Sequence, residues 1–257
     1  MNIKHTILKS VILTTAFLWI IHVQSQDGNS QILILAEEGT IHRPFVDEAE
    51  KILDSVAWGH QFKMVKLSNT ELINEEYLKD FSLIIQLDYP PYMWTESAKV
   101  AFMDYIENGQ GGWLGFHHAT LLGDFDGYPM WDWFSKFMGG ILFENYIPNF
   151  AGALVHVEKS QHPVFSGVLG DFWIDKEEWY IYNKSPRANT IVLASVDESS
   201  YDTSTSIKMG DHPVIWSNPE MKANNIYIFM GHHPGLFRNP DYKRIFINAV
   251  LWCLQNP

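Results

Sequence analysis

Two pairs of adjacent histidines each follow a strongly apolar run of sequence. His117 and His118 follow GGWLGF, and His232 and His233 follow NIYIFMG. An imidazole exchanges protons near neutral pH and also coordinates divalent metal ions, so a histidine at a strand end is a candidate general base or ligand. The alternative is a structural histidine that hydrogen-bonds loop carbonyls and orders the turn. We predict catalytic roles for His117 and His232.

The second histidine of each pair has a weaker case. His118 would point away from His117 if the strand continued, because successive side chains of a strand alternate between its faces. We expect His118 to help shape the turn, and we keep it as a candidate for substrate binding. His233 precedes Pro234, which fits a structural role.

Glu178 and His42 complete the set of candidate functional residues. Glu178 lies among aromatic residues in EEWYIY (177–182), where partial burial would raise the pKa of its carboxyl group and suit acid–base work. The alternative is an exposed or ion-paired carboxylate. We predict Glu178 to be catalytic. His42 follows the first apolar run of the chain, and we predict that it binds substrate.

The same residues are of the types that bind zinc or another transition-metal ion. They are scattered along the sequence and show neither HxH nor HExxH spacing. A divalent metal ion is therefore expected only if the fold brings four side chains together, namely those of His42, His117, Glu178 and His232.

Apolar strands alternate with helical patterns in the first half of the chain. Continuous or alternating apolar residues predict strands at 31–36, 62–67, 81–88 and 113–117. Apolar residues at helical spacing predict helices at 45–56 and 96–107. This alternation predicts an α/β fold with a doubly wound, mostly parallel sheet.

The second half is less regular. A loop and a short helix are expected within 122–138, followed by strands at 151–157, 190–196, 213–217 and 225–233, and a closing helix at 241–254. Residues 197–212 are polar and are expected to form a surface loop.

Ligands of open parallel sheets bind beyond the carboxyl ends of the strands. Three predicted strand ends carry polar or aromatic residues: Glu37-Glu38-Gly39 with nearby His42, Asp88-Tyr89, and His117-His118. Aromatic rings near such ends can stack on the apolar face of a sugar, so we predict a carbohydrate site that includes Tyr89, Trp131 and Trp179. The alternative is that these rings fill the core.

The charge balance narrows the range of partners. The chain has 257 residues, with 18 Lys and Arg against 30 Asp and Glu, for a net charge of −12. Nucleic-acid binding needs clustered Lys and Arg, and the sequence has no basic run. We therefore expect no nucleic-acid partner; the small-molecule carbohydrate partner that we predict rests on the aromatic residues above and on the resemblance described below.

The first 25 residues have the pattern of a secretory signal peptide. Lys4 and Lys9 precede an apolar stretch, and Val23-Gln24-Ser25 fits cleavage before Gln26. The alternative is a membrane anchor, but the apolar stretch is shorter than the ~20 residues that a span needs. We predict a signal peptide at 1–25, a single domain at 26–257, export to the periplasm, and no stable membrane insertion after cleavage.

Several motifs in order resemble the ThuA-like family, named for trehalose utilisation. They are GGWLGFHHAT (111–120), HPVFSG (162–167), IDKEEWYIY (174–182), HPVIW (212–216) and YIFMGHHPGLFRNPDYKRIFINAVLW (227–252). The resemblance implies a flavodoxin-like fold of the class I glutamine amidotransferase type. It also implies a role in the metabolism of trehalose or other glycosides, with oxidised keto-sugars as a substrate class.

The positions that match the family's motifs are occupied by the candidate functional residues named above. His117 takes the family's histidine after the Gly-Gly strand, Glu178 lies in the acidic-aromatic segment, Gly231-His232 matches the late Gly-His, and His42 fits the loop after the first strand. His118 stands where the family usually has alanine.

Amidotransferases of this fold carry a nucleophilic cysteine in the turn after a central strand. Here that turn reads GFHHA, and its nearest hydroxyl, that of Thr120, lies beyond it. The single cysteine, Cys253, lies in an apolar helical pattern and is expected to be a small buried residue. A glutaminase or serine-hydrolase mechanism is therefore not expected.

These observations predict an exported enzyme of carbohydrate catabolism that acts on a glycoside or keto-sugar derivative. The chemistry would be acid–base catalysis by His117, His232 and Glu178, or metal-assisted catalysis at the same residues. The alternative is a noncatalytic sugar-binding protein that uses the same cleft.

Overall fold

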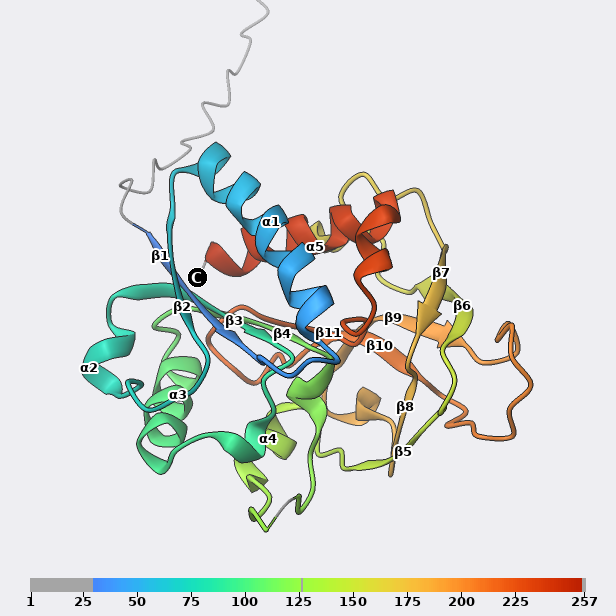
Figure 1. The fold of residues 1–257 in the computed structure, drawn as a ribbon, viewed down its shortest axis with the longest axis horizontal. Helices are drawn as coiled ribbons and strands as arrows, with labels where there is room; N and C mark the ends of the chain where they lie inside the picture. The colour runs from blue at the N-terminus through green and yellow to red at the C-terminus, as the bar shows by residue number, and fades with distance from the viewer. Residues whose placement is uncertain (1–29, 126, 256–257) are drawn as a thin grey trace, which may run out of the picture.

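The computed structural model describes residues 30–125 and 127–255, which form an α/β fold (Figure 1). The expected signal peptide, at 1–25, lies outside the described residues. A nine-stranded sheet has the order β2-β1-β3-β4-β11-β10-β9-β6-β7, and β5 and β8 form a separate pair. Along the described chain, no helix is both long and apolar enough to cross a membrane.

The parallel part of the sheet comprises five neighbouring strands: β1 (Gln31–Ala36), β2 (Lys63–Leu67), β3 (Phe81–Leu87), β4 (Gly112–Phe116) and β11 (Asn225–Ile228). The central strands β1, β3 and β4 read as continuous apolar runs because helices cover both of their faces. Each fully buried Leu or Ile contributes about 1.5–3 kcal/mol to folding.

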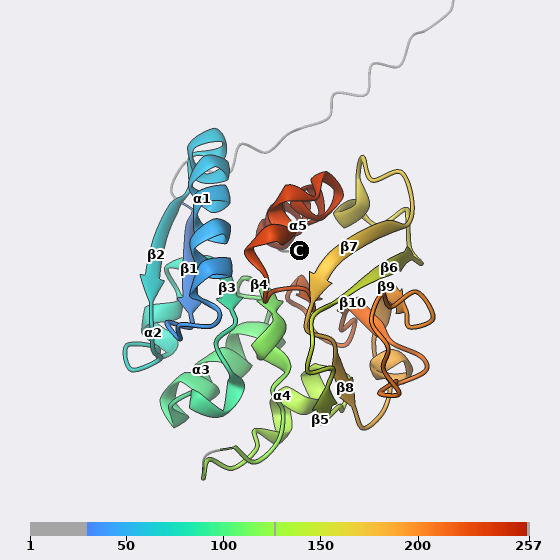
Figure 2. The same ribbon diagram turned by 45° about the vertical axis from the view of Figure 1, so that its right-hand side comes forward.

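Antiparallel strands extend the sheet on one side. These are β10 (Pro213–Ser217), β9 (Ile191–Asp197), β6 (Ala151–Val157) and β7 (Phe172–Glu177). The separate pair is β5 (Phe143–Tyr146) and β8 (Tyr180–Tyr182), which Figure 2 shows on the same side as the short helix α4. The predicted α/β class with a mainly parallel central sheet is confirmed, and the antiparallel strands come from the irregular second half.

Helices pack on both faces of the sheet (Figure 1). α1 (Arg43–His60) and α5 (Pro240–Leu254) lie on one side, and α2 (Glu75–Leu78), α3 (Glu96–Glu107) and α4 (Asp132–Phe137) on the other. The buried stripe of α1 has the predicted helical spacing: Phe45, Val46, Ala49, Leu53 and Val56. Short 3₁₀ segments complete the chain: η1 (Pro91–Met93), η2 (His117–Thr120), η3 (Pro163–Phe165), η4 (Pro186–Ala188) and η5 (Pro234–Arg238).

The ends of β4 and β11, both at the candidate site, come earlier than the sequence-based expectation. β4 ends at Phe116, and His117 begins η2. β11 ends at Ile228, although apolar residues continue to Met230. The apolar pattern overextends these strands because the turns that follow them are also buried.

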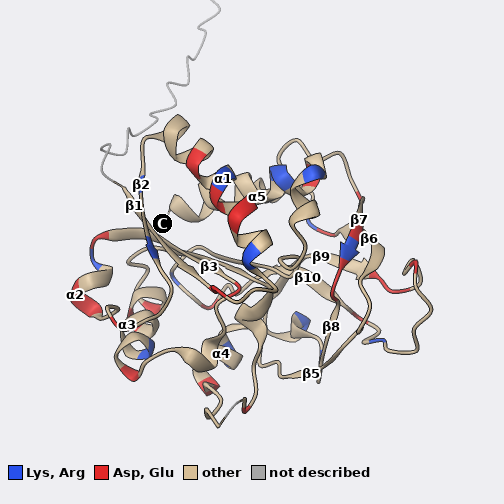
Figure 3. Ribbon diagram, in the orientation of Figure 1, with Lys and Arg blue, Asp and Glu red and all other residues tan. Residues whose placement is uncertain are grey.

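The basic residues lie on several elements and pair with nearby acids (Figure 3). Arg43 bonds Asp47 and Lys51 bonds Glu48 on α1, and Lys99 pairs with Glu96 on α3. Because each pair uses one basic and one acidic residue, the excess of acidic residues, 30 against 18, is unchanged.

Candidate active site

His117 occupies a strained turn between β4 and η2. Its φ of 38° lies in the left-handed region, which costs energy for a residue with a Cβ atom. Its carbonyl oxygen accepts hydrogen bonds from the hydroxyl groups of Thr120 at 3.0 Å and Tyr227 at 2.9 Å. These two bonds help to hold the conformation that directs the imidazole toward the ends of neighbouring strands.

Gly231 makes room for this turn. A Cβ atom built on Gly231 would lie 2.8 Å from Cβ of His117, 3.0 Å from Oδ1 of Asp88 and 3.2 Å from Cβ of Phe116. The turn after β11 therefore packs directly against the turn after β4, which brings the two histidine pairs of the sequence together.

Four histidines meet at the carboxyl ends of the parallel strands, and we call them the histidine cluster: His42, His117, His118 and His232. The ring centroid of His42 lies 3.9 Å from that of His118, 4.5 Å from that of His232 and 5.4 Å from that of His117. The His117 ring lies 5.1 Å from each of the other two. The strand register explains the convergence, because Ala36 aligns with Leu87 and Phe116 with Ile228.

The expectation that His118 points away from His117 was wrong. The strand ends at Phe116, so the alternation of strand side chains does not reach this pair. The two rings are nearly parallel, with an interplanar angle of 14°, and His118 contributes to the cluster as directly as its neighbour.

Glu37 follows β1 and holds two histidines of the cluster. Its Oε2 atom lies 2.6 Å from Nδ1 of His118 and 3.3 Å from Nδ1 of His42. Burial alone would raise the pKa of Glu37, but the hydrogen bond with His118 and the nearby imidazole of His42 outweigh it and hold the pKa at about 2. Glu37 was not among the predicted site residues, although its position directly after a parallel strand was a usable signal.

Glu178 and Tyr180 face His117 from the β7–β8 side. Oε2 of Glu178 lies 3.6 Å from Nε2 of His117, and the Tyr180 hydroxyl lies 3.0 Å from the same nitrogen. His117 is fully buried, whereas the Glu178 side chain keeps 21% of its surface exposed. Glu178 is therefore the member of this trio that solvent and ligands reach.

Burial favours the uncharged forms of these groups. It lowers the pKa of His117 well below the usual value, lowers that of His118, and lowers that of His232 to about 4. Burial raises the pKa of the Glu178 carboxyl group. At neutral pH the site therefore holds neutral imidazoles that can accept protons or bind a metal ion.

Two fully buried carboxyl groups lie beneath the cluster. Asp88 follows β3 with a φ of 58°, and burial raises its pKa well above the usual value. Glu177 accepts hydrogen bonds from the backbone N–H groups of Glu178 at 2.9 Å and His232 at 3.4 Å, and burial raises its pKa too. Glu177 thus positions the turn, whereas its neighbour Glu178 reaches the cluster.

The three predicted aromatic residues lie elsewhere. Trp179 is fully buried, its ring stacks on Phe229, and its indole N–H donates to the Ala151 carbonyl at 2.9 Å. Trp131 packs with other core rings such as Trp94, and Tyr89 is also buried. Trp179, between β7 and β8, therefore fills the core, which was the alternative to a place at the site.

A different aromatic residue borders the site. Phe150 is 43% exposed, and its ring lies 4.8 Å from that of His232 and 5.8 Å from that of His233. It precedes β6 in an irregular segment, so no periodic pattern in the sequence marked it.

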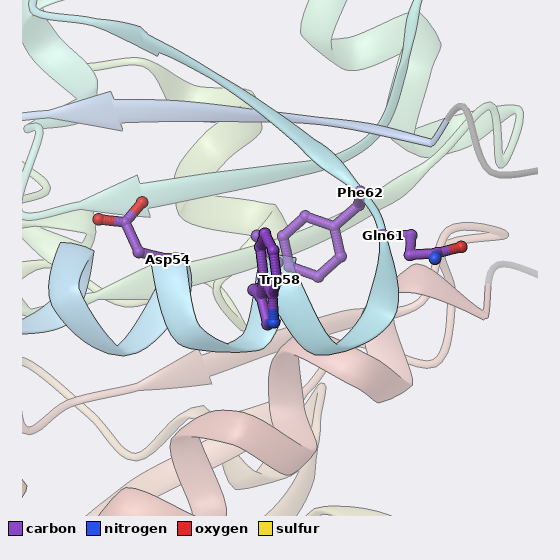
Figure 4. Close-up of a pocket in the computed structure, with 5 residues that line it drawn as sticks. Asp54, Trp58, Gln61 and Phe62 are labelled. Carbon is purple, nitrogen blue, oxygen red and sulfur yellow. The ribbon is translucent and has the colours of Figure 1, made fainter.

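Another depression lies at the far end of α1, lined by Asp54, Ala57, Trp58, Gln61 and Phe62 (Figure 4). Trp58 lies 15 positions after the first residue of α1, a separation of roughly 22 Å along the helix from the end next to His42. This depression is therefore separate from the histidine cluster.

The family profile described as trehalose utilisation, ThuA, matches residues 31–253. The chain belongs to the ThuA family. It is similar to a ThuA-like protein of solved structure from Bacteroides uniformis, with 30% identity, a TM-score of 0.78, and coverage of 88% of this chain and 91% of that one.

Two more distant structures share the fold. A ThuA-like protein from Parabacteroides merdae has 14% identity, a TM-score of 0.63 and coverage of 88% and 89%. The acivicin-bound glutaminase domain of a Trypanosoma brucei CTP synthase has 11% identity, a TM-score of 0.53 and coverage of 89% and 95%. The predicted glutamine amidotransferase-like fold is confirmed. No sequence among curated proteins matches the chain.

The ThuA-family chain does not place a thiol at this site. Cys253 is fully buried on α5, and its Sγ atom lies 3.3 Å from the Trp113 carbonyl oxygen. Burial raises the pKa of this thiol, which disfavours the thiolate that a glutaminase needs. The turn that follows β4 carries imidazole instead.

Proposed function

We propose that this ThuA-family protein is an exported enzyme of carbohydrate catabolism that acts on a glycoside or a keto-sugar derivative. The observation that carries the proposal is the convergence of four imidazoles and Glu178 at the carboxyl ends of the parallel strands. Such a set supplies both a proton acceptor and a proton donor in one place.

The burial of each group supports a division of roles. Glu178 keeps part of its side chain exposed and has a raised pKa, so it is suited to donate a proton to a departing glycosidic oxygen. His232 or His118, both neutral, would accept the proton from the carbon next to a ketone. His117 lies fully buried behind Glu178, so it exchanges protons with Glu178 rather than with the substrate directly.

Phe150 supports a sugar as the ligand. A partly exposed ring beside His232 offers a flat apolar surface, and sugars present flat apolar faces between their hydroxyl groups. Glu37 and Glu178 add carboxyl oxygens to the cluster that can hydrogen-bond those hydroxyl groups.

The amino-terminal sequence supports the proposed location. Lys4, Lys9, the apolar stretch and the small-residue cleavage pattern fit export to the periplasm. Amino-terminal sequencing of the protein from the periplasmic fraction tests this part. A mature chain that still begins at Met1 would contradict it.

The second candidate is a noncatalytic sugar-binding protein. The same aromatic ring and neutral polar groups that would orient a substrate also suffice to hold a sugar. It differs from the enzyme in one measurable respect, because a binding protein releases its ligand unchanged.

Turnover of a 3-keto-glycoside by the pure protein decides between the two. We expect Glu178→Gln to lower turnover about 100-fold or more, since general acid–base groups contribute that much, with ligand affinity largely kept. Glu144→Gln, on exposed β5, is the matched control and should leave turnover unchanged. Tight binding of the keto-glycoside without any product, with or without added divalent metal, would favour the binding protein.

A further inference from the structure

The histidine cluster contains two overlapping sets of potential metal ligands. The ligand atoms of His42, His117 and His118 lie within 4.8 Å of one another, and so do those of His117, Glu178 and His232. His117 belongs to both sets, so the two sets adjoin at its ring. Two nitrogens bound to the same zinc ion lie about 3.3 Å apart, so binding would need the more widely spaced ligand atoms to approach one another by side-chain rotation.

Several nitrogens of the cluster lack a protein partner. Both ring nitrogens of His42 and Nδ1 of His117 are buried and make no hydrogen bond with the described residues. His42 lies near Glu37, but the contact lacks hydrogen-bond geometry. A buried polar atom without a partner costs about 1–3 kcal/mol, so three of them at one location indicate that these rings are shaped for another ligand.

Glu37 has the position of an outer-shell carboxylate. Its bond to Nδ1 of His118 leaves Nε2 of that ring directed elsewhere, which is the arrangement that orients histidine ligands in metal sites. The same carboxylate reaches His42. Glu178, partly exposed on the open side, is placed to complete the ligand set while leaving room for a substrate.

We propose that the histidine cluster binds a single divalent transition-metal ion of the zinc class, with Glu178 as the ligand on the solvent side and Glu37 orienting His118 and His42. Imidazole nitrogens with one carboxylate suit zinc, cobalt, nickel, copper or iron, whereas calcium and magnesium prefer all-oxygen sets. The proposal rests on the geometry of the cluster alone. With an ion bound, Glu178 and the ligating imidazoles would not exchange protons with the substrate, so the reaction would take the metal-assisted form.

Metal binding by the purified full-length mature protein tests the proposal without any activity measurement. Protein stripped by a chelator is titrated with Zn²⁺ in a calorimeter, and Co²⁺ is added separately to record the visible absorption of a nitrogen-ligated ion. We expect a single equivalent of either ion to bind. We expect Glu37→Gln to weaken binding about 10–100-fold, as loss of an outer-shell partner does, and His118→Ala to weaken it further.

A matched control separates the cluster from incidental histidines. His156 is a partly exposed histidine that pairs with Asp171 at 2.7 Å on the far antiparallel side of the sheet. His156→Ala should leave metal affinity unchanged. Thermal unfolding of every stripped variant checks the fold, and His118→Asn replaces His118→Ala if the latter is unstable.

The outcomes are distinct. Failure of the wild-type protein to bind either ion, or an equal loss of affinity in His156→Ala and His118→Ala, overturns the metal site. Stoichiometric binding that depends on His118 and Glu37 supports it. If the stripped protein turns over keto-glycosides at the full rate, the proposed enzyme stands and the ion has no part in its reaction.

Discussion

Nδ1 of His118 lies 2.6 Å from Oε2 of Glu37, although 81 positions separate the two residues in the sequence. The contact joins the end of β1 to the turn after β4, two strands that both pair with β3 and not with each other. It therefore closes the candidate site across the intervening strand. A parallel sheet brings the residues after its strands together at one edge. Here they meet as one carboxylate, that of Glu37, which contacts the imidazoles of His118 and His42.

Removal of this carboxylate should destabilise the protein. Glu37→Ala leaves the buried His118 ring without its partner, and loss of a hydrogen bond to a charged group costs about 1.5–3 kcal/mol of unfolding free energy. Urea unfolding at neutral pH, monitored by fluorescence, measures the change. Glu38→Ala removes the neighbouring carboxylate, whose contact with Arg43 is exposed, and should change the free energy by less than ~0.5 kcal/mol. Equal losses in both variants would contradict the assigned role.

Much of the fold follows from periodicity in the sequence. The parallel strands and α3 were predicted because a strand buried on both faces needs a continuous apolar run, and a surface helix needs a one-sided stripe. The ends of β4 and β11 were misplaced because buried turns are apolar as well. The antiparallel strand β7 was missed because it is half exposed and its burial alternates.

Part of the candidate site was predictable from the positions of its residues after parallel strands. His42, His117 and His232 follow parallel strands, and a parallel sheet places such positions at one edge. Glu37 also follows a parallel strand, so the same rule would have predicted it as a site residue. Phe150 could not be predicted, because it lies in a segment without periodicity and its place beside His232 depends on tertiary packing.

Gly231 provides a test of the close approach between the two histidine turns. Gly231→Ala would place a methyl group 2.8 Å from Cβ of His117, so the turn after β11 must shift. We expect a loss of about 1–3 kcal/mol in unfolding free energy, as for other overpacked sites, together with weaker ligand and metal binding. Thermal unfolding and calorimetric titration measure both.

Gly59→Ala is the matched control for this substitution. Gly59 lies near the end of α1, and a Cβ atom there meets no other atom within 4 Å. Alanine favours the helix, so the variant should be as stable as the wild type or up to about 1 kcal/mol more stable. A Gly231→Ala protein that behaved like Gly59→Ala would show that the two turns do not need this contact distance.

Arg187 provides a prediction about acid stability. Its guanidinium bonds both oxygens of Glu158, at 2.7 and 2.9 Å, and both oxygens of Asp211, at 2.7 and 2.8 Å. Hydrogen bonds from Arg187 lower the pKa of Glu158 and of Asp211 below their usual values. A lowered pKa stabilises the folded state above the pKa of the unfolded chain, and this stability is lost as the pH falls through the folded-state value.

We therefore expect Arg187→Met to lower the unfolding free energy by about 1 kcal/mol at neutral pH, a modest amount because the network is partly exposed. The difference from the wild type should shrink as the pH falls below about 4, where both carboxyl groups begin to protonate in the unfolded chain. Urea unfolding across a pH series measures it. Lys79→Met, in an exposed pair with Glu76, should leave the free energy of unfolding unchanged at any pH. A difference that grew toward acid pH would contradict the assigned ion pairs.

Phe150 is expected to contribute to ligand binding rather than to stability. Its ring is 43% exposed beside His232, so Phe150→Ala removes little buried surface from the core but takes away the apolar wall of the site. We expect the variant to bind a keto-glycoside more weakly by about 1–2 kcal/mol, as for loss of an aromatic contact, with the melting temperature nearly unchanged. Isothermal titration measures the affinity, and Phe150→Tyr should restore most of it. Trp58→Ala removes a ring that is 90% exposed at the far end of α1, so it should leave ligand affinity unchanged. If Phe150→Ala binds as tightly as Trp58→Ala, the ligand does not reach the His232 side of the cluster.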